Sequence, residues 1–126
     1  MTARVIHVNA PAEARLYQVV AYVRPEAEAR VLDALRPVPG LTGVTVVEGR
    51  GFGRGHRPNA ADAEVVYGTA PVVRIEIMVS ETLVDAVVHV VQAAAHTGRR
   101  GDGKVYVAPL LEATRIATGE GGAGAV

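Results

Sequence analysis

The sequence of 126 residues contains no cysteine and no tryptophan, and aromatic residues make up only 4% of it. Without cysteine the chain cannot use disulfides, thiolate catalysis or cysteine-ligated zinc, and we expect a cytoplasmic location. So few aromatic rings leave little surface for stacking on single-stranded nucleic acid. Thirteen basic residues balance thirteen acidic ones, which argues against the basic face of a nucleic-acid-binding domain. No apolar run reaches the length of a membrane span, and no signal-peptide pattern opens the chain.

The residues that are present predict one globular domain with a substantial core. Hydrophobic residues make up 49% of the chain, which is typical of a folded protein rather than a disordered one. We expect residues 15–126 to form this domain. Residues 1–14, which Pro11 interrupts, are expected to form an N-terminal arm.

Several segments have the alternation or the β-branched composition of strands. The clearest follows Pro71, where Val73, Ile75, Ile77 and Val79 would share one face. The expected strands are residues 16–24, 44–50, 71–79 and 104–108, and residues 113–118 are a further candidate.

Two segments between these strands have helical spacing. Pro25 suits the first position of the first helix. Ser80 is expected to cap the second helix at its N-terminus, and Gly98 to end it. The apolar stripe of the first helix comprises Ala27, Val31, Leu32 and Leu35, and that of the second comprises Leu83, Val84, Val87, Val88, Val91, Ala94 and Ala95.

The order strand, helix, strand, long loop, strand, helix, strand predicts an α+β fold, the ferredoxin-like βαββαβ sandwich. Two helices would cover one face of a four-stranded antiparallel sheet. The other face would still carry Leu16, Val20, Tyr22 and Met78. Because such an apolar face needs a partner, we expect a homo-oligomer built on the sheets.

The stretch from Thr97 to Lys104 combines three glycines with basic side chains between a helix and a strand. Glycines allow a tight turn whose backbone N–H groups can cradle an anion. The spacing nearly fits a P-loop, but Val105 replaces the magnesium-binding Ser or Thr, and the helix precedes the loop instead of following it. A helix end followed by a solvated turn explains the same residues, and this stretch alone leaves both interpretations open.

Two more segments carry glycine and arginine, namely Gly51–Arg54 and Arg115–Glu120. Each alone is better explained as a loop root or a solvated strand arginine. If all three segments meet at one edge, they form a phosphate site. Glu76 and Asp102 are the only carboxylates expected near it.

We find no residues that predict catalysis or a metal site. Ser80 is the only serine, and no nucleophile–base pair has suggestive spacing, so we predict that the protein is not an enzyme. His56 in the long loop gives only a weak metal hypothesis, together with Asp62 and Glu64.

These motifs resemble the PII signal-transduction family over residues 16–126. The resemblance is most specific in residues 44–54, 73–77, 97–104 and 115–120. It implies a homotrimer that binds an adenine nucleotide (ADP, AMP or ATP) in clefts between subunits, with the need for magnesium left open. It also implies that residues 51–70, the T-loop, contact a regulated transporter or enzyme, and that a small-molecule effector binds.

The resemblance also assigns nucleotide-binding roles to individual residues. Phosphate would be met at the T-loop root by Gly51, Gly53 and Arg54. The loop after the second helix (the B-loop) would surround the phosphates with Gly101, Asp102, Gly103 and Lys104. One arginine from the neighbouring subunit, Arg115, would join them, and the adenine and ribose would lie by Thr45, Glu76 and Met78.

The chain departs from the family pattern at three ligand positions. Gly55 stands where the family has a glutamine that helps to hold magnesium and 2-oxoglutarate. Val72 replaces a lysine that meets 2-oxoglutarate, and Ala117 replaces a second phosphate arginine. We therefore expect ADP or AMP to bind at least as well as ATP, and 2-oxoglutarate to bind poorly. That profile is similar to PII-like proteins linked to bicarbonate or to metal efflux.

Two other functions compete with this hypothesis. One is a classical PII nitrogen regulator. The other is a small ferredoxin-like phosphohydrolase of the acylphosphatase type. That chemistry needs a glycine-rich phosphate loop after the first strand, where this chain has Arg24 and Pro25.

Overall fold

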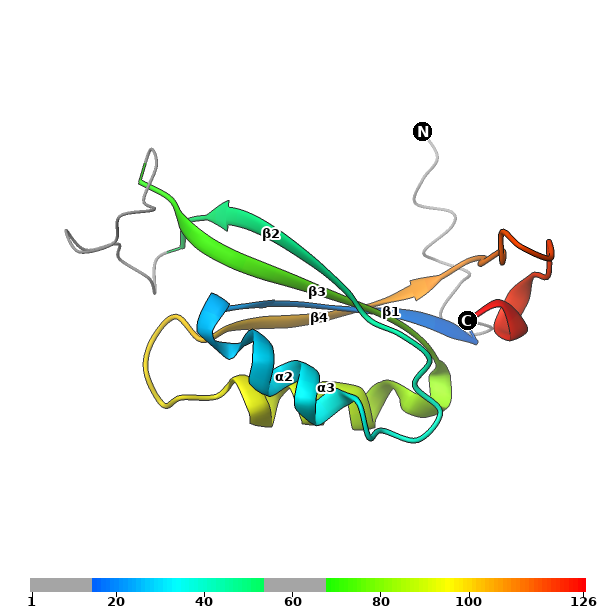
Figure 1. Ribbon diagram of the computed structural model, residues 1–126, viewed down its shortest axis with the longest axis horizontal. Coiled ribbons are helices and arrows are strands. Elements are labelled where there is room, and N and C mark those ends of the chain that lie inside the picture. Colours follow the sequence, from blue (N-terminus) through cyan, green and yellow to red (C-terminus); the bar gives the residue numbers. More distant parts are fainter. Residues whose placement is uncertain (1–14, 54–67) are drawn as a thin grey trace.

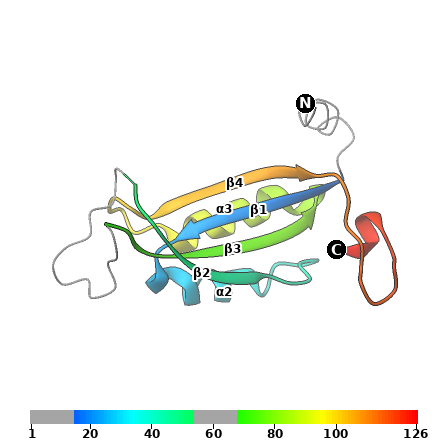
Figure 2. The same cartoon turned by 90° about the horizontal axis from the view of Figure 1, so that it is seen from above.

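A computed structural model of the protein describes residues 15–53 and 68–126. Two helices cover one face of a four-stranded antiparallel sheet, with strand order β2-β3-β1-β4 (Figures 1 and 2). The ferredoxin-like prediction is confirmed. The strands are β1 (Leu16–Val23), β2 (Thr45–Gly51), β3 (Ala70–Ser80) and β4 (Gly103–Leu110), and the helices are α2 (Glu28–Leu35) and α3 (Val84–Ala95).

The core lies between the sheet and the helices. The alternation predicted for β3 holds, because Val73, Ile75, Ile77 and Val79 are all at most 3% exposed. They pack with Val19, Ala21 and Val23 of β1, with Ala27, Val31 and Leu35 from the first helical segment, and with Val87, Val91 and Ala95 of α3. Full burial of each valine, leucine or isoleucine side chain in this set stabilises the fold by about 1.5–3 kcal/mol.

The first helical segment begins at Pro25, as predicted, with one 3-10 turn (Pro25–Ala27) that leads into α2. The prediction for Ser80 is wrong in one respect. Ser80 does precede the 3-10 turn Glu81–Leu83, but its side chain makes no capping hydrogen bond to the helix backbone. Its Oγ instead lies 3.0 Å from Oγ1 of Thr82, because the two hydroxyls bond each other.

The predicted end of α3 at Gly98 is also wrong. The helix ends at Ala95, and His96 is already extended. The backbone N–H of Thr97 donates to Oδ2 of Asp102 at 2.7 Å, so the chain turns toward that side chain before it reaches the glycine.

The candidate strand at residues 113–118 is not a strand. It forms a tight turn with one isolated bridge between Thr114 and Gly121. The N–H of Arg115 donates to the carbonyl of Glu120, and the N–H of Gly119 donates back to the carbonyl of Arg115, both at 2.8 Å. Gly119 has a φ of 76°, which glycine adopts without steric cost and which ends the extended run.

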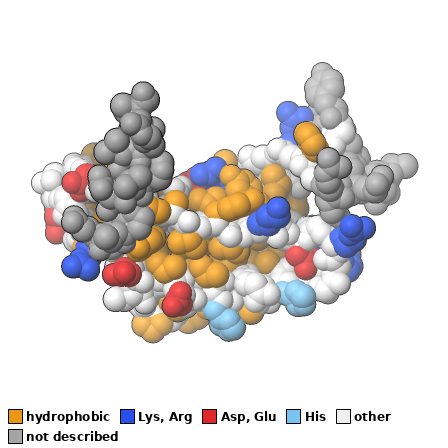
Figure 3. Space-filling model, turned by 180° about the vertical axis from the view of Figure 1, so that it is seen from behind, with side chains coloured by type: hydrophobic (Ala, Val, Ile, Leu, Met, Phe, Trp, Pro, Cys, Tyr) orange, Lys and Arg blue, Asp and Glu red, His pale blue; other side chains and the backbone are white. Residues whose placement is uncertain are grey.

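Parts of the predicted architecture lie outside the described residues. These parts are the N-terminal arm, most of the long loop, Arg54 and the weak metal hypothesis at His56. No helix in the two described ranges is both long enough and apolar enough to cross a membrane. Seen from behind, hydrophobic side chains gather over β4 and α3 (Figure 3), where Val107 is 44% exposed.

Candidate functional site

The loop between α3 and β4 turns on three glycines. Gly98, Gly101 and Gly103 have φ values of 85°, 87° and 111°, which only glycine adopts readily. Gly103 also lies so close to β1 that an added Cβ would be 1.8 Å from the carbonyl oxygen of Tyr22. The glycine is therefore required where this loop joins the sheet.

Asp102 organises the inside of this loop. Its carboxylate accepts hydrogen bonds from the hydroxyl and the N–H of Thr97, and it pairs with Nε of Arg24 at 3.4 Å. The two hydrogen bonds from Thr97 are the main reason that the pKa of Asp102 is lowered to about 2. Arg24 also lowers this pKa, whereas partial desolvation of the carboxylate opposes the shift. Its two oxygens are engaged by Thr97 and Arg24, so the predicted contact between Asp102 and a ligand stays a prediction.

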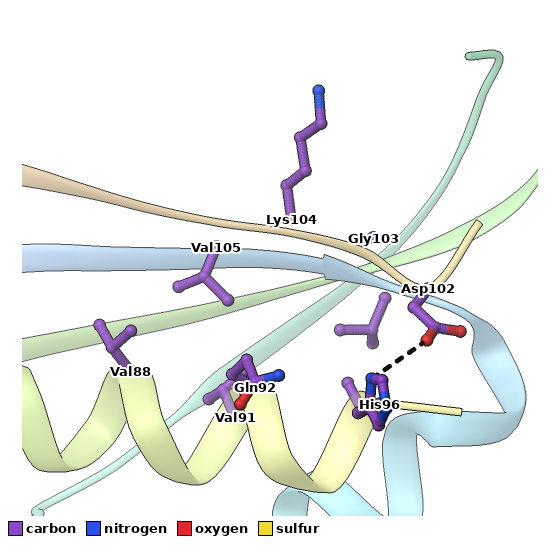
Figure 4. A pocket seen from close by; sticks show the side chains of 10 residues that line it. Val88, Val91, Gln92, His96, Asp102, Gly103, Lys104 and Val105 are labelled. Carbon is purple, nitrogen blue, oxygen red and sulfur yellow. Dashed lines mark ion pairs between the residues drawn. The ribbon is translucent and has the colours of Figure 1, made fainter. Parts of the chain in front are cut away.

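Lys104 and Asp102 point to opposite sides of the sheet (Figure 4). On the helix side, a groove of about 380 Å³ is lined by Val88, Gln92, His96 and Asp102, among others. The Lys104 side chain rises away from this groove and is exposed. It therefore belongs to the face of the sheet that the helices leave open.

The open face brings several predicted residues together. In the strand register Lys104 lies opposite Tyr22, and Tyr22 lies opposite Arg74. Two residues after Arg74 in β3, Glu76 lies opposite Thr45 of β2. Four of the predicted nucleotide-binding residues share this face, and they are Thr45, Glu76, Met78 and Lys104.

Sequence reasoning missed Arg74 and Tyr22 as members of this group. Arg74 donates from NH1 to the hydroxyl of Tyr22 at 2.8 Å, and its guanidinium carbon lies 5.6 Å from the centre of that ring. Its Nε lies 2.6 Å from Oε2 of Glu76, an ion pair that is not aligned as a hydrogen bond. The alternation of the strand could have indicated Arg74, because it is two residues from Glu76 and therefore lies on the same face of the sheet.

A hollow of about 360 Å³ opens on this face beside the Arg74 group. Tyr22 and Tyr106 meet edge to face at 6.0 Å between ring centroids and form one of its walls. The hollow is thus lined by aromatic rings and a guanidinium group, which suit a flat, polar-edged ligand. Its lining residues are Gln18, Val20, Tyr22, Arg74, Tyr106 and Ala108.

The root of the long loop lies at the same end of the sheet as the loop after α3 (Figure 1). Val23 at the end of β1 pairs with both Gly103 and Val73, and β2 ends nearby where Gly51 pairs with Ala70. Gly53 is exposed two residues further along the chain. The predicted convergence of these two glycine segments at one edge is therefore compatible with the strand register.

Arg115 lies at the opposite end of the sheet within one chain. Leu110, where β4 ends, pairs with Leu16, and strand geometry places it roughly 23 Å from Gly103. Arg115 donates to the carbonyl of Gly124 at 3.3 Å and lies 3.7 Å from Oε1 of Glu120. A single chain therefore does not bring Arg115 to Lys104.

Within residues 15–53 and 68–126, no group of three or more histidine or acidic side chains is arranged to hold a metal ion. The first strand runs directly into the turn at Pro25–Ala27. No glycine-rich phosphate loop therefore stands where an acylphosphatase-type enzyme would need one.

Comparison with known proteins gives consistent results. A family model described as "Nitrogen regulatory protein P-II" matches residues 16–120. The chain is 42% identical over 111 residues to the nitrogen regulatory protein P-II of Azospirillum brasilense, covering 86% of this chain and 98% of that protein. It is 38% identical over 104 residues to the nitrogen regulatory protein GlnK of Escherichia coli, covering 81% and 92%. The crystal structure of Arabidopsis thaliana PII bound to citrate is 34% identical, with a TM-score of 0.74 over 92% of this chain and 96% of that one.

Proposed function

Because this chain belongs to the PII family of nitrogen regulatory proteins, we propose that it binds an adenine nucleotide and signals the bound state to a partner protein. The observation that carries the proposal is the placement of Lys104. It extends from a glycine loop onto the same sheet face as Thr45, Glu76 and Met78. A cation beside a backbone cradle suits phosphate, and the aromatic hollow next to it suits a base.

The comparisons favour the classical nitrogen regulator over the bicarbonate-linked role that Gly55, Val72 and Ala117 had suggested. The A. brasilense and E. coli relatives are both named as nitrogen regulatory proteins. We therefore propose nitrogen signalling as the role of this chain. The departures at those three positions then bear on how well individual ligands bind, rather than on the pathway.

The site requires more than one copy of the chain. Lys104 and Arg115 lie at opposite ends of one sheet, so the arginine must come from a neighbour if both meet one nucleotide. Ile116, next to Arg115, is 99% exposed, and Tyr106 on the open face is 52% exposed. Association of copies would cover these side chains, in the homotrimer that the family resemblance implies. Residues 51–70 would contact the regulated protein, as the family resemblance implies.

The proposal is tested by calorimetric titration of the full chain with ATP, ADP and AMP, each with and without magnesium and 2-oxoglutarate. We expect ADP to bind at least as tightly as ATP. Ala117 removes one charged contact, and such a contact contributes about 1.5–3 kcal/mol, roughly ten-fold or more in affinity. We also expect 2-oxoglutarate to leave the ATP affinity almost unchanged. Tight magnesium-dependent ATP binding that 2-oxoglutarate enhances would contradict the ligand prediction, and no binding of any nucleotide would contradict the function.

Replacing Arg115 by alanine should weaken ADP binding about ten-fold or more, because a charged contact to phosphate is lost. The oligomer should persist, which sedimentation velocity would check. Arg15→Ala is a suitable control, since Arg15 is exposed and lies 3.9 Å from Glu81 at the same end of the sheet. An exposed pair of this kind contributes little. Equal affinities of wild type and Arg115→Ala would remove Arg115 from the site.

A further inference from the structure

Arg24 links the end of β1 to the loop after α3 by two contacts. Its Nε lies 3.4 Å from Oδ1 of Asp102, and its NH2 donates to the backbone carbonyl of Arg100. The arginine itself is held firmly, because it follows the last residue of β1 and its carbonyl accepts the N–H of Ala27 at 2.9 Å. Arg24, at the end of a strand, thus bonds to a loop that lies more than seventy residues later in the chain.

We propose that Arg24, Asp102 and Thr97 form a positioning unit that holds the loop at residues 97–103 in its phosphate-ready shape, with Asp102 acting on the loop and not on the nucleotide. This inference rests on the proposed function of the loop. It assigns Asp102 a role that differs from a ligand contact, gives Thr97 a role within the stretch, and adds Arg24, which lies outside the stretch.

The bonding of Asp102 supports this assignment. Its two oxygens already accept two hydrogen bonds from Thr97 and face the guanidinium of Arg24. A carboxylate turned outward would repel a phosphate, whereas one turned inward leaves the backbone N–H groups of the glycines free to face an anion. Both side chains of the ion pair are largely covered, with 16% of Arg24 and 20% of Asp102 exposed. Such a pair is screened less by salt than an exposed one.

The loop needs such a unit because glycine gives it little stiffness of its own. Three positions have left-handed φ values, and glycines have the largest conformational freedom to lose on ordering. A loop that is ordered before the ligand arrives does not have to be ordered by the ligand, so affinity rises. Among the described residues, the other ionisable side chains near this unit are His96, whose Nδ1 lies 3.9 Å from Oδ2 of Asp102, and the exposed Arg99, Arg100 and Lys104.

The test compares Arg24→Met and Thr97→Val with the wild-type chain in titrations with ADP and with adenosine. We expect ADP to bind about ten-fold more weakly to each variant, and adenosine, which has no phosphate, to bind with unchanged affinity. Thr97→Ser keeps the hydroxyl and should restore ADP binding fully. Arg36→Met is the matched control, because Arg36 pairs with Asp33 at 2.8 Å on the surface, with 71% of its side chain exposed.

Hydrogen exchange of the nucleotide-free protein tests the positioning unit without any ligand. Amides of residues 98–103 should exchange about ten-fold faster in Arg24→Met and Thr97→Val, while the β3 amides stay protected in both. Unchanged loop exchange, or equal losses for ADP and adenosine, would overturn the inference. If the wild-type chain binds no adenine nucleotide, the proposed function fails, and the exchange result still decides whether the loop is held in this way.

Discussion

Replacing Gly103 by alanine is expected to lower the free energy of unfolding by about 2–5 kcal/mol. A left-handed conformation costs an alanine about 1–2 kcal/mol, and forcing an extra methyl into packed structure costs about 1–3 kcal/mol. Here the methyl would lie 1.8 Å from the carbonyl oxygen of Tyr22 and 2.9 Å from its carbonyl carbon. Both atoms belong to the backbone of β1, one of the two inner strands, so they cannot move aside as a side chain could.

Urea unfolding followed by circular dichroism would measure this loss. The matched control is Gly98→Ala in the same loop. Gly98 has a φ of 85°, but no atom lies within 4 Å of the position of its added Cβ. It should therefore show only the conformational cost of about 1–2 kcal/mol. Equal losses in the two variants would mean that the close approach to β1 does not matter.

Replacing Lys104 by methionine is expected to weaken ADP binding about ten-fold to one hundred-fold, since a charge-assisted contact contributes about 1.5–3 kcal/mol. The methionine keeps most of the aliphatic stem and removes the charge. Because the Lys104 side chain is exposed, stability should change little. Calorimetric titration and a urea curve on the same sample would separate the two effects.

Arg99→Met is the control for the Lys104 prediction. Arg99 is exposed in the same loop and carries the same charge, but it does not project from a strand onto the open face. Its loss should lower ADP affinity only a few-fold, through the weaker general field of the loop. If both variants lost affinity equally, Lys104 would act through the field alone and would have no specific place in the site.

Most of the fold could be predicted because local patterns and tertiary packing agree. The alternation of Val73, Ile75, Ile77 and Val79 in the sequence matches their burial in the structure. Predictions were wrong where hydrogen bonds within a turn, rather than the spacing of apolar residues, decide the local geometry. The end of α3 depends on the bond from Thr97 to Asp102, which spacing alone does not show. Residues 113–118 have strand-like composition, yet the turn at Gly119 closes on Arg115 within four residues.

Some residues of the candidate site could also be predicted from the sequence, and others could not. Glycine and lysine at residues 101–104 indicated phosphate from the sequence, because their chemistry is local. The roles of Arg24 and Arg74 depend on strand register, which places Arg24 beside Asp102 and Arg74 between Tyr22 and Glu76. Register follows from the whole pattern of pairing and not from any short motif. For that reason, the sequence could predict glycine and lysine as ligand-facing residues of the loop, whereas the supporting contact from Arg24 needed the structure.

The position of β1 in the sheet has a consequence for the order in which the protein is completed. β1 is made before the other strands, yet one of its two neighbours is β4, which is made after them. Synthesis proceeds from the N-terminus, and pairing between distant segments is slow because the loop must close before any contact compensates for it. The candidate phosphate loop connects α3 to β4, the strand that pairs with β1. A nascent or truncated chain that lacks β4 would leave one edge of β1 unpaired, so the nucleotide binding proposed above would depend on a completed sheet.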